Sequence, residues 1–204
     1  MIDRKVLAES RILIVDDNAS NVMLMERLLQ MAGYRNHSAV TDSREVLERF
    51  RTFRPDLILL DLMMPNMDGY AVLRQLSGWI PDRIYLPVLV ITADTAPAAR
   101  KRAMELGAKD FLTKPIDALE ATLRINNLLT TRWLYSQMES RDQVRLAQAA
   151  TSKQKLEASL KELDRVMATG GSNDLTLLRY ELLEAAAAIG KLNGSEDTLL
   201  ATAS

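Results

Sequence analysis

Residues 57–69, LILLDLMMPNMDG, decide the fold of this 204-residue chain. Four apolar residues in succession, with no polar alternation, are typical of a strand covered on both faces, as in a parallel sheet between layers of helices. Asp61 stands where this strand ends, before a segment that contains Pro65 and closes at Gly69. Because ligands of open parallel sheets bind outside the carboxyl ends of the strands, an acid at this edge is placed for chemistry. An Asp that only caps a turn is the alternative at this point.

A second apolar strand, residues 11–17 (RILIVDD), also ends in acids, Asp16 and Asp17. In a doubly wound sheet with strand order 2-1-3-4-5, this strand and the strand of Asp61 are neighbours, so their carboxylates converge at the topological switch point. Like charges at this distance repel one another unless a cation neutralises them. Carboxylate oxygens suit Mg²⁺, which binds through one or two carboxylates, several waters and a phosphate. The sequence therefore predicts a magnesium site.

Two further strand ends bring complementary groups to the same edge. Residues 87–93 (PVLVITA) contain Thr92 at the strand end, and residues 110–115 (DFLTKP) contain Lys114. A hydroxyl and an ammonium supply the hydrogen-bond donors and the positive charge that a transferring phosphoryl group needs. The strand ends together predict a phosphoryl-transfer site.

These motifs resemble, in order and spacing, the receiver domain of response regulators, the phospho-accepting half of two-component systems. The resemblance covers about residues 10–129, so we expect a receiver domain over 1–129. It implies an α/β fold with a doubly wound, five-stranded parallel sheet in the order 2-1-3-4-5 and helices on both faces. Asp61 resembles the phospho-acceptor, whose carboxylate attacks phosphorus and becomes an acyl phosphate. The implied donor is a sensor histidine kinase or a phosphotransfer protein.

The resemblance also assigns the metal ligands. It implies that Asp17 binds Mg²⁺ directly, that Asp16 holds it partly through water, and that Asp61 and the backbone carbonyl of Met63 complete the protein's share. Taken alone, the two adjacent acids would equally suit helix caps. Met63 and Asp94 occupy positions that in this family tune how quickly the phosphoryl group is hydrolysed.

Three other residues match the family's switch. Thr92 resembles the switch hydroxyl, and Phe111 resembles the switch aromatic, whose rotamer follows the position of Thr92. Lys114 resembles the lysine that bridges the acceptor and the phosphoryl oxygens. Seen alone, the threonine would be structural and the phenylalanine would be core. We expect a cis peptide bond between Lys114 and Pro115, because such bonds are essentially a proline phenomenon.

Bulk composition favours a soluble cytoplasmic protein. The chain has no cysteine, its formal net charge is −1, and its first residues, MIDRKVLAESR, are too charged for a signal peptide. No apolar run approaches the length of a membrane span. A net charge near zero offers no electrostatic basis for binding nucleic acid. We therefore expect neither a membrane nor a nucleic-acid partner.

Two residues argue against other phosphate chemistries. His37 is the only histidine and lies on the expected edge strand, whereas phosphotransfer proteins present their phospho-donating histidine on a helix. The acidic edge also resembles that of haloacid-dehalogenase phosphatases, whose nucleophilic Asp is followed two residues later by an acid. Here that position is Met63. We expect no enzyme activity beyond the chain's own phosphoryl transfer and autodephosphorylation.

The remaining pattern predicts the helices that cover such a sheet. Apolar residues recur at helical spacing between the strands, and a partly polar run indicates an edge strand. The expected helices are 19–32, 41–51, 69–77 and 96–106, and the expected edge strand is 34–40. Gly78 is expected to stop the third helix, and a fifth helix begins near Ile116 or Asp117. The alternation predicts a three-layer sandwich.

From Asp117 a helical pattern continues without Gly or Pro until Gly170. This length predicts an all-α extension, a coiled coil over 130–169 that continues the fifth helix and joins two copies of the chain. The seam is clearest at residues spaced four, three and four, which are Leu156, Leu160, Leu163 and Met167. Between Glu139 and Arg145 the seam is poor, and we expect a stutter or a break there. A solvated helix that folds back on the receiver is the alternative.

Residues 170–204 are the third expected part. Gly170 and Gly171 end the long helix, a short helix is expected over 175–189, and 193–204 are expected to fray. No winged-helix, GGDEF or HD metal-ligand signature is present. The receiver and its LLTTRWLYSQ continuation resemble the front end of HD-GYP response regulators, in which a coiled coil leads to a cyclic-dinucleotide enzyme.

These patterns lead to one main hypothesis and two alternatives. The main hypothesis is a phosphorylation-controlled interaction protein, in which the face of the fourth helix, the fifth strand and the fifth helix changes and alters a homodimer. The first alternative is the regulatory fragment of a larger response regulator whose cyclic-dinucleotide phosphodiesterase or cyclase is missing. The second is a phosphate sink with no output.

Overall fold

The computed structural model describes residues 8–81, 84–168, 180 and 182–185. The chain divides into two compact units, Met1–Ser136 and Gln137–Ser204. The first unit reaches a few residues past the predicted end of the receiver domain at 129. The expected short helix at 175–189 lies mostly outside the described residues, and the expected frayed end lies wholly outside them.

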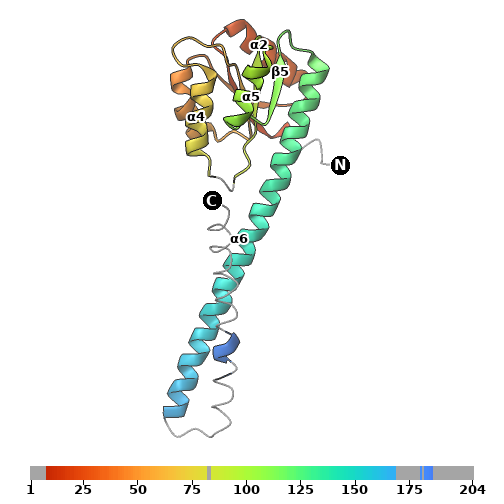
Figure 1. Ribbon diagram of the computed structural model, residues 1–204. Coiled ribbons are helices and arrows are strands. Elements are labelled where there is room, and N and C mark those ends of the chain that lie inside the picture. Colours follow the sequence, from red (N-terminus) through yellow and green to blue (C-terminus); the bar gives the residue numbers. More distant parts are fainter. Residues whose placement is uncertain (1–7, 82–83, 169–179, 181, 186–204) are drawn as a thin grey trace. The chain divides into compact units, whose positions relative to one another are not determined.

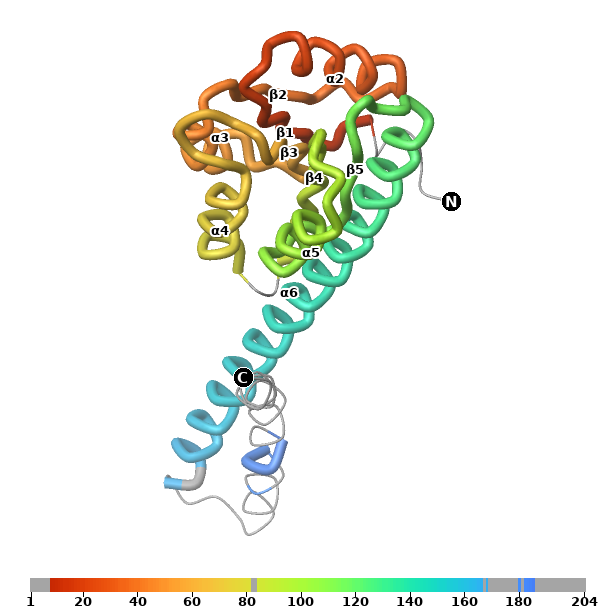
Figure 2. The backbone as a smooth tube through the Cα atoms, turned by 45° about the horizontal axis from the view of Figure 1, so that its top comes forward, coloured from red at the N-terminus to blue at the C-terminus, as the bar shows by residue number. Residues whose placement is uncertain are grey.

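The first unit is built on a five-stranded parallel sheet in the order β2-β1-β3-β4-β5, which confirms the predicted topology (Figure 2). Each strand is short, and the three central ones are buried along almost their whole length, which is typical of strands covered on both faces. The strands are β1 (Arg11–Val15), β2 (Asn36–Val40), β3 (Leu57–Leu60), β4 (Val88–Thr92) and β5 (Asp110–Thr113).

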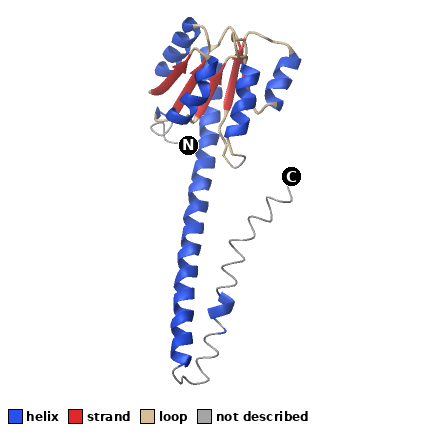
Figure 3. Ribbon diagram, turned by 90° about the vertical axis from the view of Figure 1, so that its left-hand side faces the viewer, coloured by secondary structure: helices blue, strands red, loops and turns tan. Residues whose placement is uncertain are grey.

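Helices cover both faces of the sheet (Figures 1 and 3). They are α2 (Ala19–Met31), the 3₁₀ turn η1 (Ser43–Glu45), α3 (Val46–Phe53), α4 (Gly69–Trp79), α5 (Pro97–Glu105) and α6 (Ala118–Ala168). Alternate residues of each strand point to opposite faces. On β1, Ile12 and Ile14 pack with α2 and α6, whereas Leu13 and Val15 pack with α3, α4 and α5. Two apolar cores therefore hold the three layers together.

Local boundaries depart from the sequence expectations in three places. Gly78 does not stop its helix, because α4 continues to Trp79 and the Ile80 N–H still donates to the Leu76 carbonyl at 2.9 Å. A single glycine costs a helix about 1 kcal/mol, which packing readily offsets. The second helix begins with the 3₁₀ turn η1, whose N-terminus is capped by Asp42. Of the stutter or break expected between Glu139 and Arg145, the break is absent, since α6 is continuous from Ala118 to Ala168, and the stutter stays a prediction.

The described helices do not have the character of membrane spans. None of them combines the length and the hydropathy that a span across a bilayer requires.

Candidate functional site

Asp61 follows the last residue of β3 and is held by its backbone and its side chain. Its N–H donates to the Val15 carbonyl at 2.9 Å, which continues the pairing of β3 with β1 by one residue. Its side chain is buried, and Oδ1 accepts from the Met63 N–H at 3.1 Å. The predicted phospho-acceptor therefore sits in a defined orientation at the carboxyl edge of the sheet.

The loop after Asp61 returns tightly over the strand end. Gly69, the first residue of α4, donates its N–H to the Leu62 carbonyl at 3.0 Å. A Cβ on Gly69 would lie 2.3 Å from the Asp61 carbonyl oxygen and 2.7 Å from the Leu62 Cα, distances that real Cβ atoms do not show. Only glycine therefore lets the helix approach the acceptor this closely.

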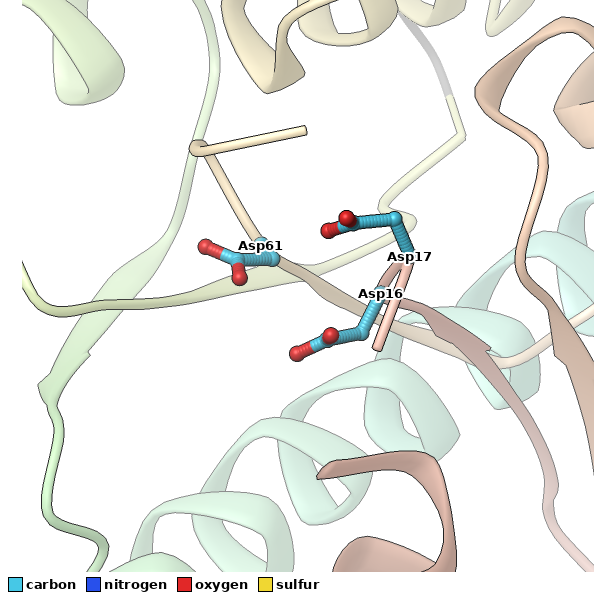
Figure 4. Close-up of side chains that lie close together, drawn as sticks. All are labelled: Asp16, Asp17 and Asp61. Carbon is cyan, nitrogen blue, oxygen red and sulfur yellow. The ribbon is translucent and has the colours of Figure 1, made fainter. Parts of the chain in front are cut away.

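Asp16 and Asp17 follow β1, next to β3. Asp16 is buried, and its N–H donates to the Val40 carbonyl at 3.3 Å, whereas Asp17 is exposed. The three carboxylates lie close together (Figure 4), and each offers a ligand oxygen within 4.8 Å of the others. The sequence prediction that two strand ends bring these acids together is thus met by the geometry.

Lys114 connects two of the acids. Its Nζ lies 2.8 Å from Asp16 Oδ2 and 2.6 Å from Asp61 Oδ2. Burial by itself lowers the pKa of Lys114, but the hydrogen bonds and charges of Asp16 and Asp61 outweigh burial and raise this pKa above its ordinary value. The backbone N–H of Lys114 donates to the Thr92 carbonyl at 2.9 Å. The Lys114–Pro115 peptide bond is cis.

The expected switch residues lie on β4 and β5. Thr92 is completely buried, and its Oγ1 accepts from the Asp94 N–H at 3.3 Å. Asp94 Oδ1 in turn accepts from the Ala96 N–H at 2.9 Å, directly before α5. Phe111 is buried in the core that includes α3, α4 and α5. A chain of contacts thus leads from the strand end to the start of α5.

The donor set fits Mg²⁺. Three carboxylates within reach of one another are hard oxygen ligands, and one of them, Asp17, is exposed to solvent, which would leave room for the waters that this ion retains. Met63 is exposed, and its contribution through the backbone carbonyl stays a prediction. With a magnesium ion and Lys114, the edge would offset the negative charge of a phosphoryl group.

One residue at the site was missed by sequence reasoning. Asn21, on the first turn of α2, donates from Nδ2 to Asp16 Oδ1 at 3.0 Å and to Asp16 Oδ2 at 3.1 Å. The available signal was a polar, poorly helix-forming residue close after the paired acids. Without the fold, that signal cannot be separated from the neighbouring helix-start residues.

The comparisons with known proteins agree with this geometry. The family model described as "Response regulator receiver domain" matches residues 12–126, more than half of the chain. The chain belongs to this family. The solved receiver domain of the Francisella response regulator 1452 has 26% sequence identity and a TM-score of 0.55, and the match covers 60% of this chain and 98% of that one. The receiver domain of a signal transduction histidine kinase from Syntrophus aciditrophicus has 36% identity and a TM-score of 0.54, with 60% and 91% covered.

Among curated proteins, the chain is similar to longer response regulators. It is 39% identical over 133 residues to the response regulator PleD of Caulobacter vibrioides, a match that covers 65% of this chain and 29% of PleD. It is 37% identical over 119 residues to the alkaline phosphatase synthesis transcriptional regulatory protein PhoP of Bacillus subtilis, covering 58% of this chain and 48% of PhoP. The chain therefore spans less than half the length of these relatives.

Proposed function

We propose that this protein is a phospho-accepting response regulator in which Asp61 takes a phosphoryl group from a sensor histidine kinase or a phosphotransfer protein, with Mg²⁺ as cofactor. The observation that carries the proposal is the placement of Asp61. It is a buried carboxylate at a strand end, 2.6 Å from the Lys114 ammonium and within ligand distance of Asp16 and Asp17.

Each residue has a defined part in the transfer. A carboxylate oxygen of Asp61 forms the new bond to phosphorus as the bond from phosphorus to the donor's nitrogen breaks. Lys114, whose pKa is raised, remains protonated and balances charge on the phosphoryl oxygens. Asp16, Asp17 and the Met63 carbonyl would hold Mg²⁺, which supplies the second positive charge. Met63 and Asp94 are the proposed positions that tune hydrolysis.

The proposed output runs through α5, β5 and α6. Movement of the Thr92 hydroxyl toward a phosphoryl group would remove the acceptor of the Asp94 N–H, and Asp94 caps the segment that leads into α5. Phe111 would follow, and the face formed by α5, β5 and α6 would change. Because β5 leads directly into α6, this change would alter how two copies of the helical extension pair, a small local event biasing an interface.

Phosphoryl labelling tests the assignment. Purified protein with Mg²⁺ and acetyl phosphate should gain one phosphoryl group by intact-mass spectrometry, and Asp61→Asn and Asp61→Ala should gain none. Asp56→Asn is the matched control, because Asp56 directly precedes β3, at the opposite end of that strand from Asp61. Label that persists on either Asp61 variant contradicts the proposal.

A second candidate is the regulatory part of a longer response regulator whose output enzyme does the chemistry. The match to only 29% of PleD and 48% of PhoP favours this possibility. The resemblance to HD-GYP regulators remains a prediction. Mass spectrometry of the native protein, to determine whether it continues past Ser204, separates this candidate from an interaction protein. A phosphate sink, the third candidate, would show no change in association on phosphorylation.

A further inference from the structure

The carboxylate of Asp16 accepts hydrogen bonds on both oxygens. Oδ1 accepts from the Asn18 backbone N–H at 2.9 Å and from Asn21 Nδ2 at 3.0 Å. Oδ2 accepts from the same Asn21 amide at 3.1 Å and from Lys114 Nζ at 2.8 Å. An ionised carboxylate has about four lone-pair sites, and three donors hold this one, which leaves room for a further ligand.

The three donors to Asp16 differ in how many other groups they contact. The Asn18 N–H is a backbone group and contacts one oxygen. Lys114 is shared with Asp61, so any movement of its ammonium toward a phosphoryl group withdraws it from Asp16. Asn21 contacts both oxygens and therefore holds the carboxylate head group in place whichever way Lys114 turns. The Asn21 contacts therefore hold the Asp16 carboxylate both while Lys114 is in contact with it and after the ammonium moves away.

From this geometry we infer that Asn21 is a positioning residue for Mg²⁺ binding, which holds the Asp16 carboxylate in the orientation that the metal and its waters require. The inference rests on the proposed function, because it concerns the cofactor of the same site. Groups that orient metal-binding carboxylates typically contribute 10–100-fold to metal affinity, so a loss of about 10-fold is the expected size of the effect.

The position of Asn21 supports a role beyond helix formation. It lies in the first turn of α2, half-buried, where alanine or leucine would favour the helix more. Side chains that break a local preference concentrate at functional sites. Its amide is directed at the acid rather than at its own backbone, since Nδ2 donates to both oxygens of Asp16.

Calorimetric titration with MgCl₂, in the absence of any phosphodonor, tests the inference. Asn21→Leu keeps the branched shape and the number of side-chain heavy atoms without a donor, and Asn21→Ala is the smaller second variant. Both should raise the Kd for Mg²⁺ about 10-fold. Ser20→Ala is the matched control, because Ser20 lies in the same turn with an exposed side chain and should leave the Kd unchanged.

A second readout separates positioning from structural damage. With acetyl phosphate, the Mg²⁺ concentration that gives half-maximal phosphorylation should rise by the same factor, while the rate at saturating Mg²⁺ returns to that of the wild type. Urea unfolding without Mg²⁺ reports any general loss of stability. A rate that stays low at every Mg²⁺ concentration would mean a merely structural role and would overturn the inference.

The outcomes also distinguish the two proposals. If the wild type binds no Mg²⁺, the proposed function fails and the inference fails with it. If the wild type binds Mg²⁺ and both Asn21 variants bind it equally well, the proposed function stands and only the role of Asn21 is wrong.

Discussion

At the scale of single residues, the site is held together by compensation of buried charge. Asp16 and Asp61 are both almost fully buried, and a buried carboxylate is costly unless it is paired and hydrogen-bonded. Lys114 pairs with both acids at once. A buried ion pair is seldom retained for stability, since its desolvation offsets most of its attraction. This cluster is therefore better explained by the phosphoryl group and the cation that we propose it receives.

Gly69 and Gly78 make a matched pair on α4. In Gly69→Ala the new Cβ would meet the Asp61 carbonyl oxygen at 2.3 Å. Because backbone must then shift, we expect the free energy of unfolding to fall by about 1–3 kcal/mol, with weaker phosphorylation of Asp61. In Gly78→Ala the Cβ would meet nothing within 4 Å, and the helix should gain about 0.5–1 kcal/mol. Urea unfolding of both variants measures this, and equal effects would contradict the close approach at Gly69.

Tyr34 predicts a specific loss of stability at high pH. Burial raises the pKa of its phenol to about 12 from an ordinary value of 10.0. Between pH 10 and 12 the unfolded chain therefore releases this proton while the folded chain retains it, so the free energy of unfolding falls as the pH rises. A shift of about two pKa units corresponds to a loss of about 3 kcal/mol at most.

The variant Tyr34→Phe removes this contribution. Its stability, measured by urea unfolding over the same pH range, should decline less steeply than that of the wild type. The raised pKa of Lys114 stabilises the folded chain below pH 10.5, and this contribution is also lost as the pH rises above that value. Lys114 makes this contribution in both proteins, so the difference between their slopes of unfolding free energy against pH comes from Tyr34. Equal slopes for the two proteins would mean that folding does not raise the pKa of Tyr34.

At the scale of elements, α6 is fastened to the first unit at several points. Its first turns are buried in the core on the sheet face that α2 also covers, through Ala121, Ile125, Leu128 and Leu129. Arg124 makes two hydrogen bonds to the Asp110 carboxylate, of 2.7 and 2.8 Å, at the start of β5. Farther along, Tyr135 stacks on Tyr85, with ring centroids 4.8 Å apart and an interplanar angle of 13°. The helix is thus tied to both β5 and the segment before β4.

The stacked pair predicts a measurable contribution to stability. Tyr135→Ala removes the stack, and aromatic pairs contribute about 0.5–1.5 kcal/mol beyond their buried area. We expect the free energy of unfolding to fall by about 1 kcal/mol. Tyr135→Phe keeps the ring and should retain most of the stability.

The ionisation of Tyr85 gives an independent check of the same contact. Its pKa is raised first by burial and then by Tyr135 and Asp110. Removing the Tyr135 ring exposes it, so its pKa should move down in Tyr135→Ala when followed by ultraviolet titration. An unchanged stability and an unchanged titration would show that the rings do not stack in solution.

At the scale of the whole molecule, the second unit presents one stripe along α6. Leu156, Leu160 and Leu163 are half-buried, whereas most of their neighbours on the helix are exposed. Their spacing of four and three residues matches the core positions of a heptad. The side chain of Met167, the fourth predicted seam residue, lies outside the described residues. The stripe is the surface through which we expect two copies of the chain to associate.

Light-scattering mass on a sizing column tests this expectation. With Mg²⁺ and beryllofluoride, standing in for the phosphoryl group on Asp61, we expect the mass of a dimer. Leu160→Lys should return the protein to a monomer, because it places a charge in the seam. Val144→Lys, on an exposed residue off the stripe, is the matched control and should remain a dimer.

The absolute mass without beryllofluoride decides between the proposed outputs. A monomer that becomes a dimer means that phosphorylation drives association. A dimer in both states means that phosphorylation changes an existing pair internally. A monomer in both states contradicts the seam and favours a phosphate sink.

The sequence by itself determined the sheet order, the family and the convergence of Asp16, Asp17, Asp61 and Lys114. The convergence follows from local patterns, because the residue after an uninterrupted apolar strand of a parallel sheet lies at its carboxyl edge. The sheet order and the family follow from the resemblance of these motifs to the receiver domain. The tertiary structure alone decided the Asn21 contacts, the close approach of Gly69, the passage of α4 through Gly78 and the stacking of Tyr85 on Tyr135. Each depends on which side chain or backbone atom, distant in the chain or on another element, fills the space nearby. Residue spacing along the chain does not determine which atoms of different elements come into contact, so these contacts are known only from the packed structure.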